Sequence, residues 1–212
     1  MVEKQLGSKY IMPTAFYMCM RLLFLPIFCP YGTLKKRHRF VKKLTEKKFL
    51  RGNTIMAQDL LVDLSALDLN KPVITIEDIR TVIPHRYEME QLSGIIQFDP
   101  EQKIIIGYKD VSSDEFWVRG HIPGRPLMPG VLMLEAAAQL CTYYYKMTTK
   151  DDRFLGFGGI DKVKFRGKVV PGDKLILIAK NNELRSRRAV FDTQGVVGGK
   201  LVFEAVIIGM VV

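Results

Sequence analysis

The sequence predicts an α+β fold, in which a strongly curved antiparallel sheet of about six strands wraps around one long apolar helix. Two observations carry this prediction. One long helical segment, from Gly130 to Met147, is set among several strand-like segments. Its central part, residues 131–145, contains no Lys, Arg or Asp. Because a helix that is apolar on every side must be enclosed, we expect the strands to surround it.

A short helix is expected before the strands, starting at Thr75. The Thr75 side chain can cap the helix, and the acidic Glu77 and Asp78 suit the positive end of its dipole. Pro84 cannot continue a helix, so the segment is expected to end there.

The strand segments are separated by turn signals. Residues 92–99 and 103–111 flank an Asp-Pro-Glu-Gln turn, which is the pattern of an antiparallel hairpin. After the long helix, strands are expected at 154–165, 174–184, 187–197 and 200–211, divided by turn signals at 170–173, 185–186 and 198–199.

The uneven charge distribution indicates the domain organisation. The chain has 212 residues and a formal net charge of +10, but residues 1–55 hold 12 of its 32 Lys and Arg and only two of its 22 acidic residues. The rest is neutral overall. We therefore expect a basic extension over 1–55 that is poorly ordered or not translated, with translation then starting at Met56. A linker over 56–71 and a globular domain over 72–212 follow.

The N-terminal part does not predict a membrane span or a signal peptide. Arg21 and three prolines interrupt its apolar stretch before the roughly 18 to 20 apolar residues of a spanning helix accumulate. The basic segment Lys35–Arg51 could bind anionic lipid or nucleic acid, but a solvated charge run is the simpler interpretation. We expect no nucleic-acid partner, and keep a membrane contact of residues 10–51 only as the alternative.

Cysteine usage points to a reducing compartment. Cys19, Cys29 and Cys141 are odd in number, far apart, and lack the spacing of a zinc site. We therefore expect a cytoplasmic protein without a metal.

Polar groups within the apolar helix mark a candidate site. Glu135, Gln139 and Thr142 follow at spacings of four and three, so they lie on one stripe. A carboxylate in an enclosed helix is costly unless it is neutral or paired. Glu135 is therefore either a hydrogen-bonded structural group or a functional acid. The preceding loop, stiffened by Pro and Gly over residues 120–130, carries His121, whose imidazole can take up and return a proton near neutral pH.

The run from Gly120 to Gln139 resembles the active-site segment of the FabZ-type (3R)-3-hydroxyacyl-[acyl-carrier-protein] dehydratases. These are hotdog-fold enzymes of fatty acid biosynthesis. Pro-His-Arg-Tyr at 84–87 and the stretch from Phe157 to a Pro-Gly-Asp turn at 171–173 match the family on either side, so the resemblance covers about residues 72–212. It implies a hotdog fold and a dehydratase.

The resemblance also implies the chemistry and the residues that perform it. Water would be removed from a (3R)-3-hydroxyacyl thioester to give the trans-2-enoyl thioester. His121 would be the general base, and Glu135, held protonated by its apolar surroundings, the acid. The substrate-binding residues would be Gly130 and Val131, whose backbone N–H groups would bind the thioester carbonyl, Gln139, which would orient the acid, and Tyr87, Pro129 and Phe157. No cofactor is implied, because the substrate arrives on the phosphopantetheine arm of acyl carrier protein.

Two partners are expected, acyl carrier protein and a second copy of the chain. The cations Lys162, Lys164, Arg166 and Lys168 alternate along a strand and would share a face. This is either a solvated face or a docking surface for the acidic carrier protein. By resemblance the chain forms a homodimer, or a trimer of such dimers, and each site takes His121 from one subunit and Glu135 from the other.

Departures from the family pattern leave other functions open. Ile122 stands where the family usually has Phe, a change in packing. Glu88-Met89-Glu90 stands where the family has Pro and an apolar strand that shapes the substrate entrance. Acyl-chain preference and isomerase activity are therefore open. The alternatives are another hotdog activity, an acyl thioesterase or an isomerising dehydratase, and a catalytically inactive acyl-carrier-binding module.

Overall fold

The structure, a computed structural model, describes residues 60–212. These residues belong to one compact unit that spans Ala57–Val212. The expected basic extension and the first residues of the expected linker lie outside the described residues. Within residues 60–212, no helix is long and apolar enough to cross a membrane.

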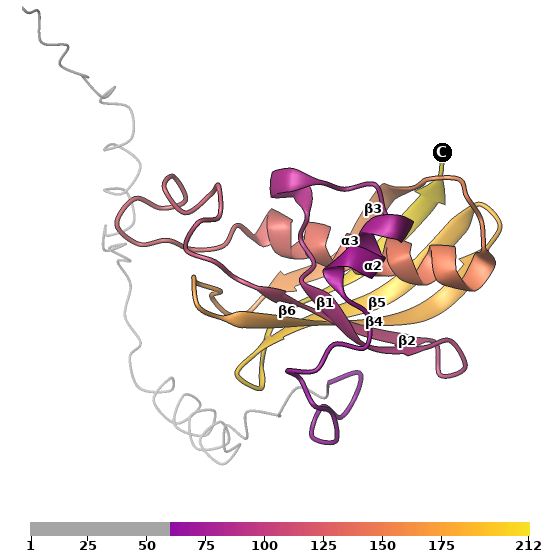
Figure 1. Cartoon of the computed structure of the whole chain (residues 1–212), viewed down its shortest axis with the longest axis horizontal. Helices are drawn as coiled ribbons and strands as arrows, with labels where there is room; N and C mark the ends of the chain where they lie inside the picture. Colours follow the sequence, from indigo (N-terminus) through magenta and orange to yellow (C-terminus); the bar gives the residue numbers. More distant parts are fainter. Residues whose placement is uncertain (1–59) are drawn as a thin grey trace, which may run out of the picture. The chain divides into compact units, whose positions relative to one another are not determined.

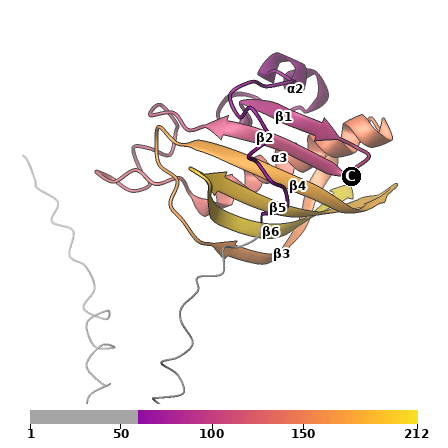
Figure 2. The same ribbon diagram turned by 90° about the horizontal axis from the view of Figure 1, so that it is seen from below.

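One long helix lies against one face of a six-stranded antiparallel sheet, as the sequence predicts (Figure 1). In chain order the elements are α2 (Ile76–Val82), the 3-10 helix η2 (Tyr87–Met89), β1 (Gly94–Asp99), β2 (Ile104–Asp110), α3 (Gly130–Thr149), β3 (Leu155–Phe165), β4 (Lys174–Arg185), β5 (Arg188–Val197) and β6 (Lys200–Val211). The strand order is β1-β2-β4-β5-β6-β3, which Figure 2 shows from the side opposite α3. The expected strands and the long helix are therefore confirmed.

The short helix α2 begins and ends where its sequence signals place it. The Thr75 hydroxyl accepts from the Asp78 backbone N–H, and the Asp78 carboxylate accepts from the Thr75 backbone N–H, which together form a capping box. Ile83 is extended, because the residue before a proline is disfavoured in the helical region. Ile79 is buried in the main core, so α2 is held beside α3.

The main core lies between α3 and the sheet. The helix buries most of its length, including all three tyrosines at 143–145. Tyr144 meets Phe191 of β5 edge-on, with ring centroids 5.6 Å apart. Burial raises the pKa of the Cys141 thiol well above its usual range, so this cysteine is an inert packing group. The tyrosines therefore pack in the core, and α3 is held firmly in the curve of the sheet.

The opposite face of the sheet is also apolar, and residues 60–69 cover part of it. Neighbouring residues in β2 and β4 alternate between two cores: Ile105 and Leu177 face α3, whereas Ile106 and Ile178 face away. Leucines of residues 60–69 pack on this second core, and Figure 1 shows the segment on the side of the sheet away from α3. This part of the expected linker is thus integrated with the folded domain.

Strand β3 forms one edge of the sheet and is irregular. Its pairing with β6 shifts register between Phe157 and Gly159 and again between Asp161 and Lys164. The edge exposes large apolar side chains, Phe157, Ile160 and Phe165. An exposed apolar strand edge is a surface suited to pairing with another chain.

We predict that Gly195→Ala destabilises the fold by about 1 to 3 kcal/mol, the usual range for overpacking a core. A Cβ at Gly195 would overlap the ring of Phe203, which is fully buried and cannot move away freely. Gly120→Ala is the matched control, because no atom lies within 4 Å of a Cβ there. Urea unfolding of both variants measures the difference. Equal midpoints would show that the core around Phe203 yields without cost.

Candidate active site

The loop before α3 holds His121 in a defined tautomer. His121 Nδ1 lies 2.7 Å from the carbonyl oxygen of Leu127, and the Leu127 N–H donates back to the His121 carbonyl at 2.8 Å. A carbonyl oxygen only accepts, so Nδ1 carries the hydrogen and Nε2 keeps its lone pair. The side chain is exposed. In the neutral imidazole the exposed Nε2 can therefore accept a hydrogen bond.

A pocket of about 550 Å³ lies next to His121 at the start of α3. Its wall includes Gly130 and Val131, the first two residues of the helix. No side chain caps the first turn, and the Leu132 N–H donates to the Pro129 carbonyl, so the N–H groups of Gly130 and Val131 are those that could reach an oxygen ligand. A Cβ on Gly130 would come within 2.6 Å of the Phe165 ring, which explains why glycine occupies this position. The pocket thus combines an imidazole with the positive end of a helix.

Glu135 belongs to a second cluster, one turn further along α3. Its Oε1 accepts from Gln139 Nε2 at 2.8 Å and lies 3.6 Å from His85 Nε2. The Glu135 side chain keeps 24% of its surface exposed. Among the described residues no hydrogen bond or ion pair joins Glu135 to His121, and Glu135 does not line the His121 pocket. Within one chain, the two predicted catalytic side chains have separate sets of contacts.

Gln139 connects this cluster to the segment that follows α2. Its Nε2 also donates to the Met89 carbonyl at 2.7 Å, and its Oε1 accepts from the Gln91 backbone N–H at 3.0 Å. The side chain is almost fully buried. Gln139 therefore fastens residues 89–91 to α3 and holds the Glu135 carboxylate.

The remaining predicted site residues occupy different surroundings. Tyr87 is 87% exposed, at a positive φ of 57° at the start of η2. Phe157 is half-exposed on the edge strand β3, and Pro129 is the N-cap of α3. Thr142, the third member of the polar stripe, donates to the Ala138 carbonyl of its own helix and does not join Glu135.

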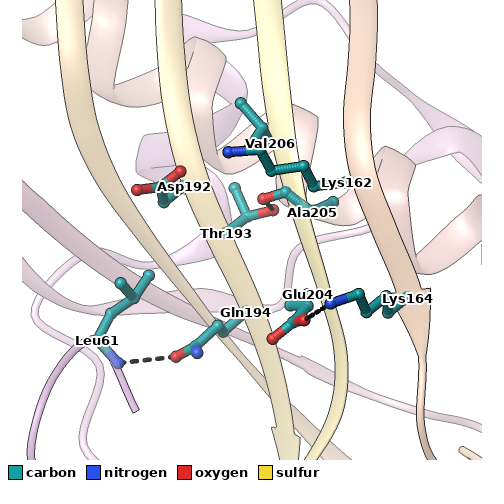
Figure 3. Close-up of a pocket in the computed structure, with 9 residues that line it drawn as sticks. All are labelled: Leu61, Lys162, Lys164, Asp192, Thr193, Gln194, Glu204, Ala205 and Val206. Atoms are coloured by element: carbon teal, nitrogen blue, oxygen red, sulfur yellow. Dashed lines mark hydrogen bonds and ion pairs between the residues drawn. The ribbon is translucent and has the colours of Figure 1, made fainter. Parts of the chain in front are cut away.

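The four predicted docking cations are divided between two pockets, because β3 is bulged and ends at Phe165. Lys162 and Lys164 line a pocket of about 310 Å³ on the outer face, next to Leu61 (Figure 3). Arg166 and Lys168 line the His121 pocket. Arg166 and Lys164 both reach Glu204, at 2.6 and 3.4 Å, and the hydrogen bond from Arg166 lowers the pKa of this carboxyl.

The segment Glu88-Met89-Glu90, which differs from the family pattern, has a structural role. Glu90 accepts from Arg80 of α2 through both carboxylate oxygens, at 2.7 and 2.8 Å, which lowers the pKa of Glu90. This pair holds the segment against α2 while Gln139 holds it against α3. The segment that differs from the family pattern is therefore held by α2 through Glu90 and by α3 through Gln139, next to Glu135.

His85 is the residue whose place sequence reasoning missed. In the sequence His85 stands within Pro-His-Arg-Tyr, 50 residues before Glu135, and no spacing connects the two. Within residues 60–212, no group of three His, Cys, Asp or Glu side chains is arranged to hold a metal ion.

Comparisons with known proteins show the family to which the chain belongs. Residues 83–206 match the family model described as a FabA-like domain. The chain is 40% identical to the 3-hydroxyacyl-[acyl-carrier-protein] dehydratase FabZ of Clostridium beijerinckii over 141 residues, covering 64% of this chain and 97% of that protein. It is 38% identical to the enzyme of the same name from Neisseria meningitidis, covering 66% of this chain and 95% of that protein.

The fold is also found among solved structures. The dehydratase heterocomplex ApeI:P from Xenorhabdus doucetiae superposes with a TM-score of 0.55 at 16% identity, covering 63% of this chain and 90% of that one. This likeness confirms the hotdog fold. Because the family model matches more than half of the chain and the relatives match over nearly their whole length, the chain belongs to the FabZ family of 3-hydroxyacyl-[acyl-carrier-protein] dehydratases.

Proposed function

We propose that the chain removes water from (3R)-3-hydroxyacyl-[acyl-carrier-protein] to give the trans-2-enoyl thioester in fatty acid biosynthesis. The observation that carries the proposal is the tautomer of His121, whose free Nε2 stands beside a pocket at the N-terminus of α3. Dehydration of a 3-hydroxyacyl thioester needs two features together: a base for the C2 proton and hydrogen-bond donors for the carbonyl oxygen.

The reaction follows from these positions. His121 Nε2 takes the C2 proton, and the electrons of that bond move toward the thioester carbonyl. Backbone N–H groups of Gly130 and Val131 donate to the carbonyl oxygen as negative charge builds on it. The enolate electrons then return to form the C2=C3 double bond as the C3–O bond breaks, and Glu135 gives its proton to the departing hydroxyl, which leaves as water. Proton transfers alone balance the reaction, so a redox cofactor is not required.

We infer that the complete site forms between two copies of the chain. His121 and Glu135 have separate contacts within one chain. We therefore infer that each meets the other residue of a second copy of the chain. The edge strand β3 offers a pairing surface with exposed Phe157 and Ile160. A homodimer whose sheets join at β3 would bring His121 of one subunit to Glu135 of the other, and three such dimers could assemble further.

The function is tested with 3-hydroxyacyl-carrier substrates of several chain lengths. We expect a rise in enoyl absorbance without release of free thiol, and the same activity from a fragment of residues 56–212, because every site residue lies in that part. Free thiol would identify a thioesterase. Neither product would identify an inactive carrier-binding module.

The composite site predicts complementation between two inactive variants. We expect Glu135→Gln and His121→Ala each to lower turnover by about a hundredfold or more, the scale of losing a positioned acid or base. When the two are unfolded together and refolded as a mixture, half of the dimers are mixed and each has one intact site. Activity should then return to about a quarter of wild type. Mixed dimers, confirmed by mass, that stay inactive would place both residues within one chain.

We propose that the carrier protein docks on the cations beside the His121 pocket, Arg166 and Lys168, with Lys162 and Lys164 further along β3. Lys168→Glu should raise KM severalfold for carrier substrates at low salt, and leave short pantetheine thioesters unaffected. Lys103→Glu is the matched control, because Lys103 lies at the β1–β2 turn, at the edge of the sheet opposite β3. Equal effects on both substrate classes would contradict docking at this surface.

A further inference from the structure

The orientation of the Gln139 amide determines the role of each Glu135 oxygen. The Gln91 backbone N–H can only donate, so the Gln139 atom facing it is the carbonyl oxygen. The Met89 carbonyl can only accept, so the atom facing it is the Gln139 NH₂ group. The same NH₂ group lies 2.8 Å from Glu135 Oε1. Glu135 Oε1 is therefore an acceptor, and a proton on this carboxyl must be carried by Oε2.

His85 approaches the same oxygen. Its Nε2 lies 3.6 Å from Glu135 Oε1, and both side chains are largely buried, with 19% and 24% of their surfaces exposed. This distance is longer than a hydrogen bond, but it places a ring nitrogen that can carry hydrogen next to the accepting oxygen. The other nitrogen, Nδ1, is buried and has no hydrogen-bond partner in the described part of the chain. Among the described residues, Glu135 is thus the polar side chain that lies within ion-pair distance of the His85 ring.

The charged side chains near His85 are paired with other groups. They therefore do not compete with Glu135 for the His85 ring. Arg80, which lines a small cavity together with His85, is held by both oxygens of Glu90. Arg86 donates to the backbone carbonyls of Ile83 and Arg80. The ring of Phe154 lies 6.4 Å from the His85 ring on another side and restricts its movement.

We propose that His85 is a positioning residue for the acid. Gln139 donates to Glu135 Oε1, and a small movement of the His85 ring, whose Nε2 lies 3.6 Å away, would let its N–H donate to the same oxygen, so the transferable proton is kept on Oε2. In the step itself the C2=C3 double bond forms as the C3–O bond breaks, and the proton leaves Glu135 Oε2 to complete the departing water. The two donors remain on Oε1 as the carboxylate becomes charged. This inference rests on the dehydration proposed above.

The test compares substitutions that differ in one hydrogen bond. We expect His85→Leu and His85→Phe to lower kcat about tenfold or more and to change KM by less than about twofold, because the lost donor acts on the acid and not on substrate binding. His85→Gln places an amide NH₂ near the position of Nε2 and should keep kcat within about threefold of wild type. Phe154→Leu is the control for packing around the ring and should keep wild-type kcat.

The outcomes separate this inference from the function on which it rests. Wild-type kcat in His85→Leu and His85→Phe would overturn it. So would a His85→Gln protein as slow as His85→Leu when both melt at the wild-type temperature, since the donor would then be irrelevant. A purified wild-type chain without dehydratase activity would instead overturn the proposed function. If His85→Leu does not fold, His85→Phe, which fills a similar space without a donor, decides the question.

Discussion

Enclosure of the apolar helix α3 in the curve of the sheet is the constraint on which the rest of the structure depends. With no Lys, Arg or Asp between residues 131 and 145, the helix has no side that water would favour. Five of the strands, β2 to β6, approach it, and aromatic side chains such as Tyr144 and Phe191 fill the space between. Burying this helix contributes a large part of the hydrophobic stabilisation, and it fixes the direction of every side chain on the helix.

That constraint explains why the polar groups of α3 are arranged as they are. A buried amide must have partners, and Gln139 finds them in the Met89 carbonyl, the Gln91 N–H and Glu135. The hydrogen bonds that satisfy the core therefore also fix the segment beside the site and one oxygen of the acid. Stability and catalytic geometry use the same side chain, so they cannot vary independently at this position.

The two side chains proposed to perform the chemistry, His121 and Glu135, are held in place by different parts of the fold. His121 is fixed by a loop whose backbone accepts its Nδ1–H, and its Nε2 is left open. Glu135 is fixed by side chains of the core and of the segment before β1. A rigid loop and a rigid helix can both hold a group within the tolerance that catalysis needs. The edge strand β3, with its exposed aromatic side chains, is the surface through which we propose that two such halves meet.

Local features of the sequence were enough to determine the elements and the loop. The capping residues of α2, the hairpin turn, the apolar length of α3 and the proline-stiffened loop with His121 act between residues close in the chain, and the structure contains each of them. The contact of His85 with Glu135, the cover of leucines 60–69 on the outer face, and the bulges that divide the β3 cations were decided by the tertiary structure. Gln139 and Met89 are 50 residues apart, and such contacts depend on the path of the folded chain, which no local spacing encodes.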